Sequence, residues 1–228
     1  MNKIIGITAL LFVVIIGLGL YVNSTKEKVA PIDASKVLEI QEDDHVSGDR
    51  DSQVVIYEYL DLQCPACAAY HPVVDQVKAA NPNVAIVTRH FPLYFHRNAR
   101  AAGAAAEAAG QQDKFNDMVG KMFEGQVLWS GLGAGAADDV FVRYAEELDL
   151  DMEAFNTYRA SDEAQAKVSR DYDGGIAAGV NSTPTFLFRG QRVAPRSVEE
   201  FQGLIDAAWA DIEESSVVSE EVSTTTTQ

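Results

Sequence analysis

Cysteine is almost absent from this chain of 228 residues, which contains only Cys64 and Cys67. Two cysteines cannot build the framework of a small disulfide-rich domain, nor a zinc site of four cysteines. The two that are present flank Pro65 and Ala66, and this spacing allows a small disulfide ring to close and reopen. The pair therefore predicts a site for reversible thiol–disulfide exchange.

Basic residues are also scarce, since 18 Lys and Arg stand against 34 Asp and Glu, for a formal net charge of −16. A large negative charge argues against nucleic acid and anionic membrane surfaces as partners. Residues 211–228 contain no Lys or Arg. Because few large apolar residues occur near the C-terminus, we expect residues 213–228 to form a disordered acidic Ser/Thr tail.

Charged residues are missing from residues 4–22, an apolar run next to the N-terminus. As a helix this run would span about 28 Å, close to the hydrocarbon thickness of a bilayer. No small-residue cleavage pattern follows it, so we expect an uncleaved transmembrane signal anchor over residues 1–24, with a cleaved signal peptide as the alternative. A charged stalk should follow over residues 25–51. This predicts a single-pass protein of the cell membrane whose catalytic domain is extracytoplasmic.

The remaining chain, residues 52–212, alternates strand-like and helical segments and shows no internal repeat. This order predicts an α/β fold with an inserted helical subdomain. The inserted block, about 96–178, is too long and too regular to be a loop. The expected segments are a strand at 53–60, a helix to about 80, a strand at 83–91, the inserted helices, strands at 185–189 and 192–194, and a helix from 197 to about 212.

Cys64 and Cys67 lie where the first strand passes into the first helix. Unpaired N–H groups and about half a positive charge at a helix N-terminus favour a thiolate. We expect Cys64 to be exposed and to be the sulfur that substrates attack, and Cys67 to be shielded and to resolve the mixed disulfide. Two alternatives remain open: a buried structural pair, or a metal site of the two cysteines with His71.

Two further positions carry hypotheses. Glu58 is the one charged residue of the first strand, and it is either a buried base for the second cysteine or a solvated edge residue. Thr183-Pro184 precedes the third strand, where a cis bond would present the Thr183 backbone to an extended peptide. His90 and His96 are expected to be packed or surface residues rather than catalytic ones.

Together these features resemble the thioredoxin superfamily, and within it the membrane-anchored, BdbD-like members of the DsbA-like thiol–disulfide oxidoreductases. The resemblance covers about residues 52–212. It implies a thioredoxin fold with a helical insertion, a nucleophilic Cys64 and a resolving Cys67. It also implies a buried acid at Glu58 and a cis bond before Pro184. The matching residues are Cys64, Cys67, Glu58, Pro72, Thr183 and Pro184.

The resemblance further implies a function. The protein would donate the Cys64–Cys67 disulfide to thiols of exported proteins, and a quinone-linked membrane thiol oxidase would reoxidise it. No metal and no cofactor beyond the disulfide is expected. Ala66 stands where strong oxidases of the family often carry histidine, which leaves the oxidising strength open. The surface that contacts substrates is expected to include Pro65, Ala66, Thr183 and Pro184.

Three alternatives to disulfide donation stay open. The first is a thiol reductase or disulfide isomerase of the same fold. The second is a peptide-binding or chaperone module in which the cysteines are structural. The third is calcium binding by acidic side chains, which cannot be distinguished from solvated acids at helix ends. The candidates for it are Asp138, Asp139, Asp149 and Asp151.

Overall fold

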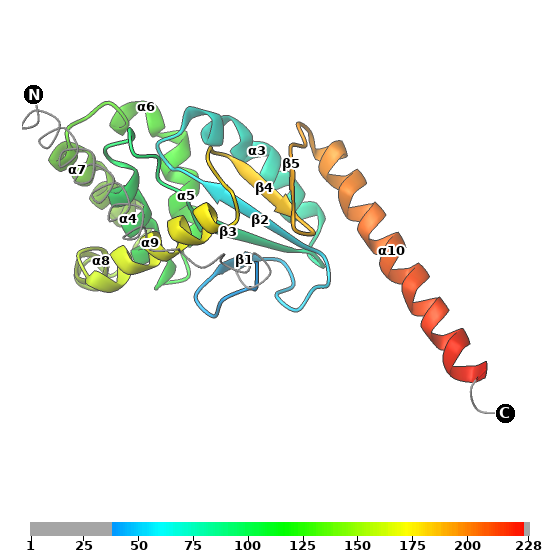
Figure 1. The fold of residues 1–228 in the computed structure, drawn as a ribbon. Helices are drawn as coiled ribbons and strands as arrows, with labels where there is room; N and C mark the ends of the chain where they lie inside the picture. Colours follow the sequence, from blue (N-terminus) through cyan, green and yellow to red (C-terminus); the bar gives the residue numbers. More distant parts are fainter. Residues whose placement is uncertain (1–37, 226–228) are drawn as a thin grey trace, which may run out of the picture. The chain divides into compact units, whose positions relative to one another are not determined.

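A five-stranded sheet forms the centre of the computed structural model, which describes residues 38–225 and the side chains of residues 38–216 (Figure 1). The strand order is β1-β3-β2-β4-β5. Strands β2 and β3 are parallel and the other neighbours are antiparallel. The strands are β1 His45–Ser47, β2 Val55–Leu60, β3 Ala85–His90, β4 Thr185–Phe188 and β5 Gln191–Val193.

The helices follow the expected order. Helix α3 connects β2 to β3, and the helices α4 to α9 lie between β3 and β4, so the α/β fold with a helical insertion is confirmed. The helices are α3 Pro65–Ala80, α4 Ala99–Gly110, α5 Phe115–Glu124, α6 Gln126–Trp129, α7 Ala134–Glu147, α8 Met152–Arg159, α9 Asp162–Ala177 and α10 Val198–Thr225.

The central strand β2 is buried on both faces of the sheet. Because side chains alternate along a strand, Ile56 faces the layer formed by α3 and α10, whereas Tyr57 and Tyr59 face the layer that contains α9. Phe201 on α10 packs into the first of these layers. The strand therefore reads as a nearly continuous apolar run in the sequence, as a central strand should.

The inserted helices have a core of their own. Its largest fully buried side chains are Trp129, Phe141 and Phe155. The small side chains of the alanine-rich helix α4 let α5, α7, α8 and α9 pack closely around it. This core also includes Cys64 and Cys67, so the insertion packs directly against the cysteine pair.

The expected stalk over residues 25–51 is wrong for its described part. Strand β1 pairs with β3, and the buried Asp44 forms an ion pair with Arg89 at 2.6 Å. A strand of three residues has too little local pattern to be recognised in the sequence, because its stability comes from its pairing with β3, a distant segment of the chain. Residues 25–37 lie outside the described residues.

The expected C-terminal tail is also wrong for the most part, because α10 continues to Thr225. No Gly or Pro occurs after Gly203, so the chain offers no signal that would stop the helix near residue 212. The predicted anchor over residues 1–24 lies outside the described residues. Among the described helices, none has the length and apolarity needed to cross a bilayer.

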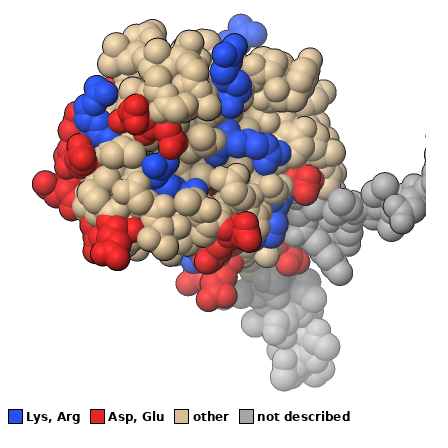
Figure 2. All heavy atoms as spheres, turned by 90° about the vertical axis from the view of Figure 1, so that its left-hand side faces the viewer, with Lys and Arg blue, Asp and Glu red and all other residues tan. Residues whose placement is uncertain are grey.

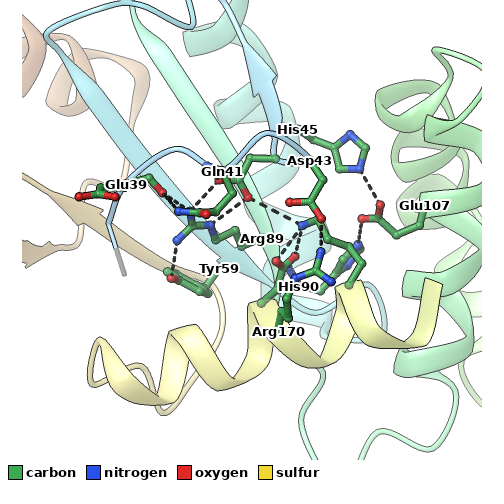
Figure 3. Close-up of polar contacts among 12 residues, drawn as sticks. Glu39, Gln41, Asp43, His45, Tyr59, Arg89, His90, Glu107 and Arg170 are labelled. Carbon is green, nitrogen blue, oxygen red and sulfur yellow. Dashed lines mark hydrogen bonds and ion pairs between the residues drawn. The ribbon is translucent and has the colours of Figure 1, made fainter. Parts of the chain in front are cut away.

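A network of buried charges joins β1, β3, α4 and α9 (Figure 3). Figure 3 shows His45 and His90 pointing toward Glu107, with contacts of 3.0 and 2.8 Å. Burial alone would raise the pKa of Glu107, but the hydrogen bonds from the two histidines outweigh it and hold the pKa well below its usual range. Lys167 contacts both carboxylate oxygens of Asp171, at 2.7 and 2.8 Å.

We predict that Glu107→Gln lowers the free energy of unfolding by about 2 kcal/mol near neutral pH, because a buried charged hydrogen-bond acceptor is lost. The folded-state pKa of Glu107 is depressed, so its contribution is present above the unfolded pKa of about 4.3 and is lost as the pH falls further. Urea unfolding of both proteins over this pH range measures the difference, which should shrink in acid.

The matched control is Glu147→Gln. Glu147 contacts Lys121 at 2.7 Å, but its side chain is 48% exposed. An exposed pair of this kind contributes at most about 1 kcal/mol, so this variant should unfold nearly as the wild type does. A difference between wild type and Glu107→Gln that stays constant into acid would contradict the assignment.

Candidate active site

The cysteine pair is located at the junction of β2 and α3. Cys64 is the N-cap residue of α3, with an extended backbone (φ −77°, ψ 120°), and Pro65 occupies the first helical position. Proline suits this position because its missing N–H would have no partner inside the helix. Pro65 and Ala66 are exposed. The helix therefore begins at the cysteines because Pro65 favours the first helical position.

The loop that contains Thr183 and Pro184 lies against Cys64. The carbonyl oxygen of Thr183 is 3.5 Å from Cys64 Sγ, within reach of the thiol as donor, although 119 residues separate the two. The Thr183-Pro184 bond is cis, as predicted. Pro184 is half-buried and Thr183 is buried. The structure thus brings together the cysteines, Thr183 and Pro184.

The expectation that Cys64 is freely exposed is wrong. Cys64 is 7% exposed and Cys67 is 2% exposed. The reason is tertiary, since the Thr183 loop and the helical insertion both pack over the start of α3. Cys64 is still the more exposed of the two cysteines. This agrees with Cys64 as the nucleophile and Cys67 as the resolving thiol.

The electrostatics of the site separate the two sulfurs. The hydrogen bond from the Cys67 thiol does most to lower the pKa of Cys64 to about 5; burial opposes it, and the backbone N–H groups of Cys67 and Ala66 support it. Burial raises the pKa of Cys67 well above its usual range. At neutral pH Cys64 is therefore a thiolate and Cys67 a thiol that donates to it.

Glu58 is buried in the centre of β2, on the sheet face covered by α3 and α10, between Thr88 of β3 and Phe186 of β4. Burial raises the pKa of Glu58, while Lys78 lowers it. The solvated alternative for this residue is therefore wrong. Its role as a base for Cys67 stays a prediction.

Four polar side chains around the cysteines were not foreseen from the sequence. Gln63 donates to the carbonyl of Ser130 at 2.7 Å, and Gln126 donates to the carbonyls of Leu62 and Cys64 at 2.7 and 3.1 Å. The other two, Asp61 and His96, contact each other at 2.7 Å, where the half-buried His96 ring meets the fully buried Asp61 carboxylate. Only Asp61 could have been recognised locally. An Asp side chain often accepts the backbone N–H of the residue two positions later, and here Asp61 accepts the N–H of Gln63.

The metal candidates are dispersed in the structure. His71 contacts Asp75 at 3.2 Å. Asp138 binds Arg159, and Asp151 caps α8 by accepting two backbone N–H groups. His90, Glu107 and Asp171 do place ligand atoms within 4.8 Å of one another, and the ammonium group of Lys167 already lies against Asp171.

One ionised thiol and one protonated thiol, separated by two residues and beside a cis-proline, define the class of thiol–disulfide oxidoreductases. A family model described as thioredoxin matches residues 41–207. The chain belongs to this family, and its fold is that of the DsbA-like members.

Solved structures agree with this fold. A thioredoxin-like oxidoreductase from Silicibacter pomeroyi is 25% identical, with a TM-score of 0.65 over 77% of this chain and 97% of that one. The alpha-DsbA1 of Wolbachia pipientis is 19% identical (TM-score 0.67, 78% and 96% covered). BdbD of Bacillus subtilis in its oxidised form is 19% identical (TM-score 0.62, 73% and 92% covered).

Curated relatives are longer proteins. The Na(+)/H(+) antiporter NhaA 1 of Salinispora arenicola is 34% identical over 169 residues, which is 73% of this chain and 25% of the antiporter. NhaA 3 of Salinispora tropica matches to the same extent. The chain thus spans about a quarter of the length of these relatives.

We predict that Cys67→Ala raises the pKa of Cys64 by about 1–2 units, because the thiolate loses its strongest hydrogen-bond donor. Thiolate absorbance or the alkylation rate as a function of pH measures the shift. Cys67→Ser is the matched control, since its hydroxyl can still donate and should preserve most of the lowering. Equal pKa values in both variants would contradict the assignment of this hydrogen bond.

Proposed function

We propose that the protein is a disulfide donor that oxidises thiols of exported proteins. The observation that carries this proposal is the low pKa of Cys64, about 5. A stable thiolate stabilises the reduced form of the pair, and a pair whose reduced form is stable is a strong oxidant. A disulfide donor must release the substrate from the mixed disulfide, and Cys64 is the sulfur that leaves in this step.

In the proposed reaction a substrate thiolate attacks Cys64 Sγ of the Cys64–Cys67 disulfide. The bond between the two cysteines breaks, a mixed disulfide forms, and Cys67 leaves as a thiolate that takes up a proton. A second substrate thiolate then attacks the substrate sulfur of the mixed disulfide and expels Cys64 as a thiolate. Two electrons pass from the substrate, which gains a disulfide, to the cysteine pair.

Glu58 is proposed as the group that exchanges this proton with Cys67, directly or through water. Its raised pKa suits a group that must hold a proton and release it again during the reaction. The sheet holds the carboxyl group beneath α3, the helix that begins at the cysteines.

The proposed substrate surface surrounds Cys64. Pro65, Ala66, Thr183 and Pro184 form its centre. Large apolar side chains near it are exposed, with Val127 at 87% and Leu128 at 64% on α6. These two follow Gln126, whose side chain donates to the Cys64 carbonyl, so α6 lies against the turn that contains Cys64. An exposed apolar surface next to a reactive sulfur suits unfolded chains, which present apolar segments.

The proposed site of action is the extracytoplasmic face of the cell membrane, with residues 1–24 as anchor and a quinone-linked membrane thiol oxidase as reoxidant. The antiporter relatives support a membrane setting, because a Na⁺/H⁺ antiporter works across a membrane. On the face that Figure 2 shows, acidic side chains gather toward one side and the lower edge, and basic side chains lie at the top and centre. The net charge of −16 argues against nucleic acid as a partner.

A reductase or isomerase is the second candidate, and one observation favours it. Ala66, exposed between the cysteines, offers no cationic side chain to stabilise the Cys64 thiolate further. The direction of exchange then depends on the potential of the pair relative to that of its partners.

We predict that the oxidised protein forms disulfides in a reduced model substrate and that Cys64→Ala abolishes this activity, because the attacked sulfur is removed. Cys67→Ala should instead accumulate mixed disulfides with substrate thiols when it is offered an oxidised substrate, since the resolving thiol is missing. Gel analysis after acid quenching measures both results. Unchanged dithiol oxidation by Cys64→Ala would exclude catalysis by the cysteine pair and favour the peptide-binding or chaperone module.

A further inference from the structure

The carboxylate of Asp61 is the most enclosed charge near the cysteines, since its side chain is 0% exposed. It accepts three hydrogen bonds: from the backbone N–H of Gln63 at 2.7 Å, from the backbone N–H of Leu93 at 2.8 Å, and from Nδ1 of His96 at 2.7 Å. It therefore connects the turn before Cys64 to the segment that follows β3. The proposed exchange reaction has not used this carboxylate.

The backbone of Asp61 contacts the cysteine pair directly. Its N–H points at Cys67 Sγ over 3.5 Å, and its carbonyl oxygen accepts the N–H of Cys64 at 3.0 Å. The side chain of Asp61 thus anchors the residue on one side while its peptide groups hold both cysteines on the other.

We propose that His96 is a positioning residue for disulfide exchange: it holds the Asp61 carboxylate, and thereby keeps the Asp61 N–H against the Cys67 sulfur. The inference rests on the proposed thiol–disulfide exchange, and it assigns a role to a residue that contacts no reacting atom. His96 was expected to be packed or at the surface, and its side chain is 15% exposed.

The N–H of Asp61 acts on Cys67 in two ways. In the reduced pair it polarises the Cys67 thiol, which makes that thiol a better donor to the Cys64 thiolate. In resolution, Cys67 loses its proton to a base, attacks Cys64 Sγ of the mixed disulfide and releases the substrate sulfur as a thiolate. The N–H stabilises the Cys67 thiolate that forms on the way. A disulfide sulfur is a weaker acceptor, so the contact favours the reduced state.

A second histidine provides a matched comparison. His71 lies on α3, its side chain is also 15% exposed, and it also pairs with an aspartate, Asp75, at 3.2 Å. Asp75, however, is 53% exposed and makes no contact with either sulfur among the described residues. If removing a histidine–aspartate pair only lowers the stability of the fold, the His71 and His96 variants should behave alike. A change in the redox equilibrium of the cysteines should occur only in the His96 variants.

The test measures the equilibrium between the full-length protein and glutathione for four proteins: wild type, His96→Ala, His96→Asn and His71→Ala. In His96→Ala we expect the equilibrium to shift about fivefold toward the oxidised pair, which is the effect of one lost hydrogen bond of about 1 kcal/mol. His96→Asn can place an amide N–H near the position of Nδ1, so it should stay within about twofold of wild type. His71→Ala should not shift the equilibrium.

The rate at which Cys67 resolves a mixed disulfide with glutathione should fall severalfold in His96→Ala and recover in His96→Asn. If His96→Ala does not fold, His96→Gln replaces it, because its longer side chain carries the N–H past the carboxylate. An unchanged equilibrium in His96→Ala or His96→Gln, or an equal shift in His71→Ala, would overturn the positioning role. A wild-type pair that forms no disulfide with glutathione would overturn the proposed function instead, so the two failures are distinguishable.

Discussion

The hydrogen bond from the Cys67 thiol to the Cys64 thiolate is the interaction on which the chemistry of the site depends. It lowers the pKa of Cys64 more than any other contact does, and it requires Cys67 to stay protonated. Burial supplies that second condition by raising the pKa of Cys67. The same environment therefore favours the thiolate of Cys64 and the thiol of Cys67. This difference makes Cys64 the better leaving group and Cys67 the resolving thiol.

Holding the two sulfurs in this relation is the work of segments that are distant in the chain. The Thr183 loop approaches Cys64 from one side, and the inserted helices reach the turn before α3 through Gln126 and Gln63. Asp61, whose carboxylate accepts a hydrogen bond from His96, contacts both cysteines through its backbone. The insertion is thus more than an addition to the sheet, because Gln126 donates to the carbonyls of Leu62 and Cys64, which would otherwise need water as a donor.

The charge network around Glu107 and Lys167 is a separate feature with a structural effect. It ties β1 and α9 to the sheet by pairing buried acids with buried bases, in a region whose isolated charges would be costly to bury. Nothing in the order of residues announces such a network, because its members come from β1, β3, α4 and α9. This is also why residues 38–51 read as a charged stalk, although Asp44 within them is buried and pairs with Arg89 inside the domain.

The sequence by itself determined most of the elements from β2 onward and their order, since the apolar runs, the proline at the start of α3 and the alanine-rich helix act through local backbone preferences. It also determined the cysteine spacing and the proline of the Thr183 loop, and through them the family. Only the tertiary structure decided how exposed Cys64 is, where Glu58 lies, that β1 joins the sheet, and that His96 reaches Asp61. Local preferences act over a few residues, whereas burial and charge pairing depend on which distant segments the fold brings within hydrogen-bonding distance.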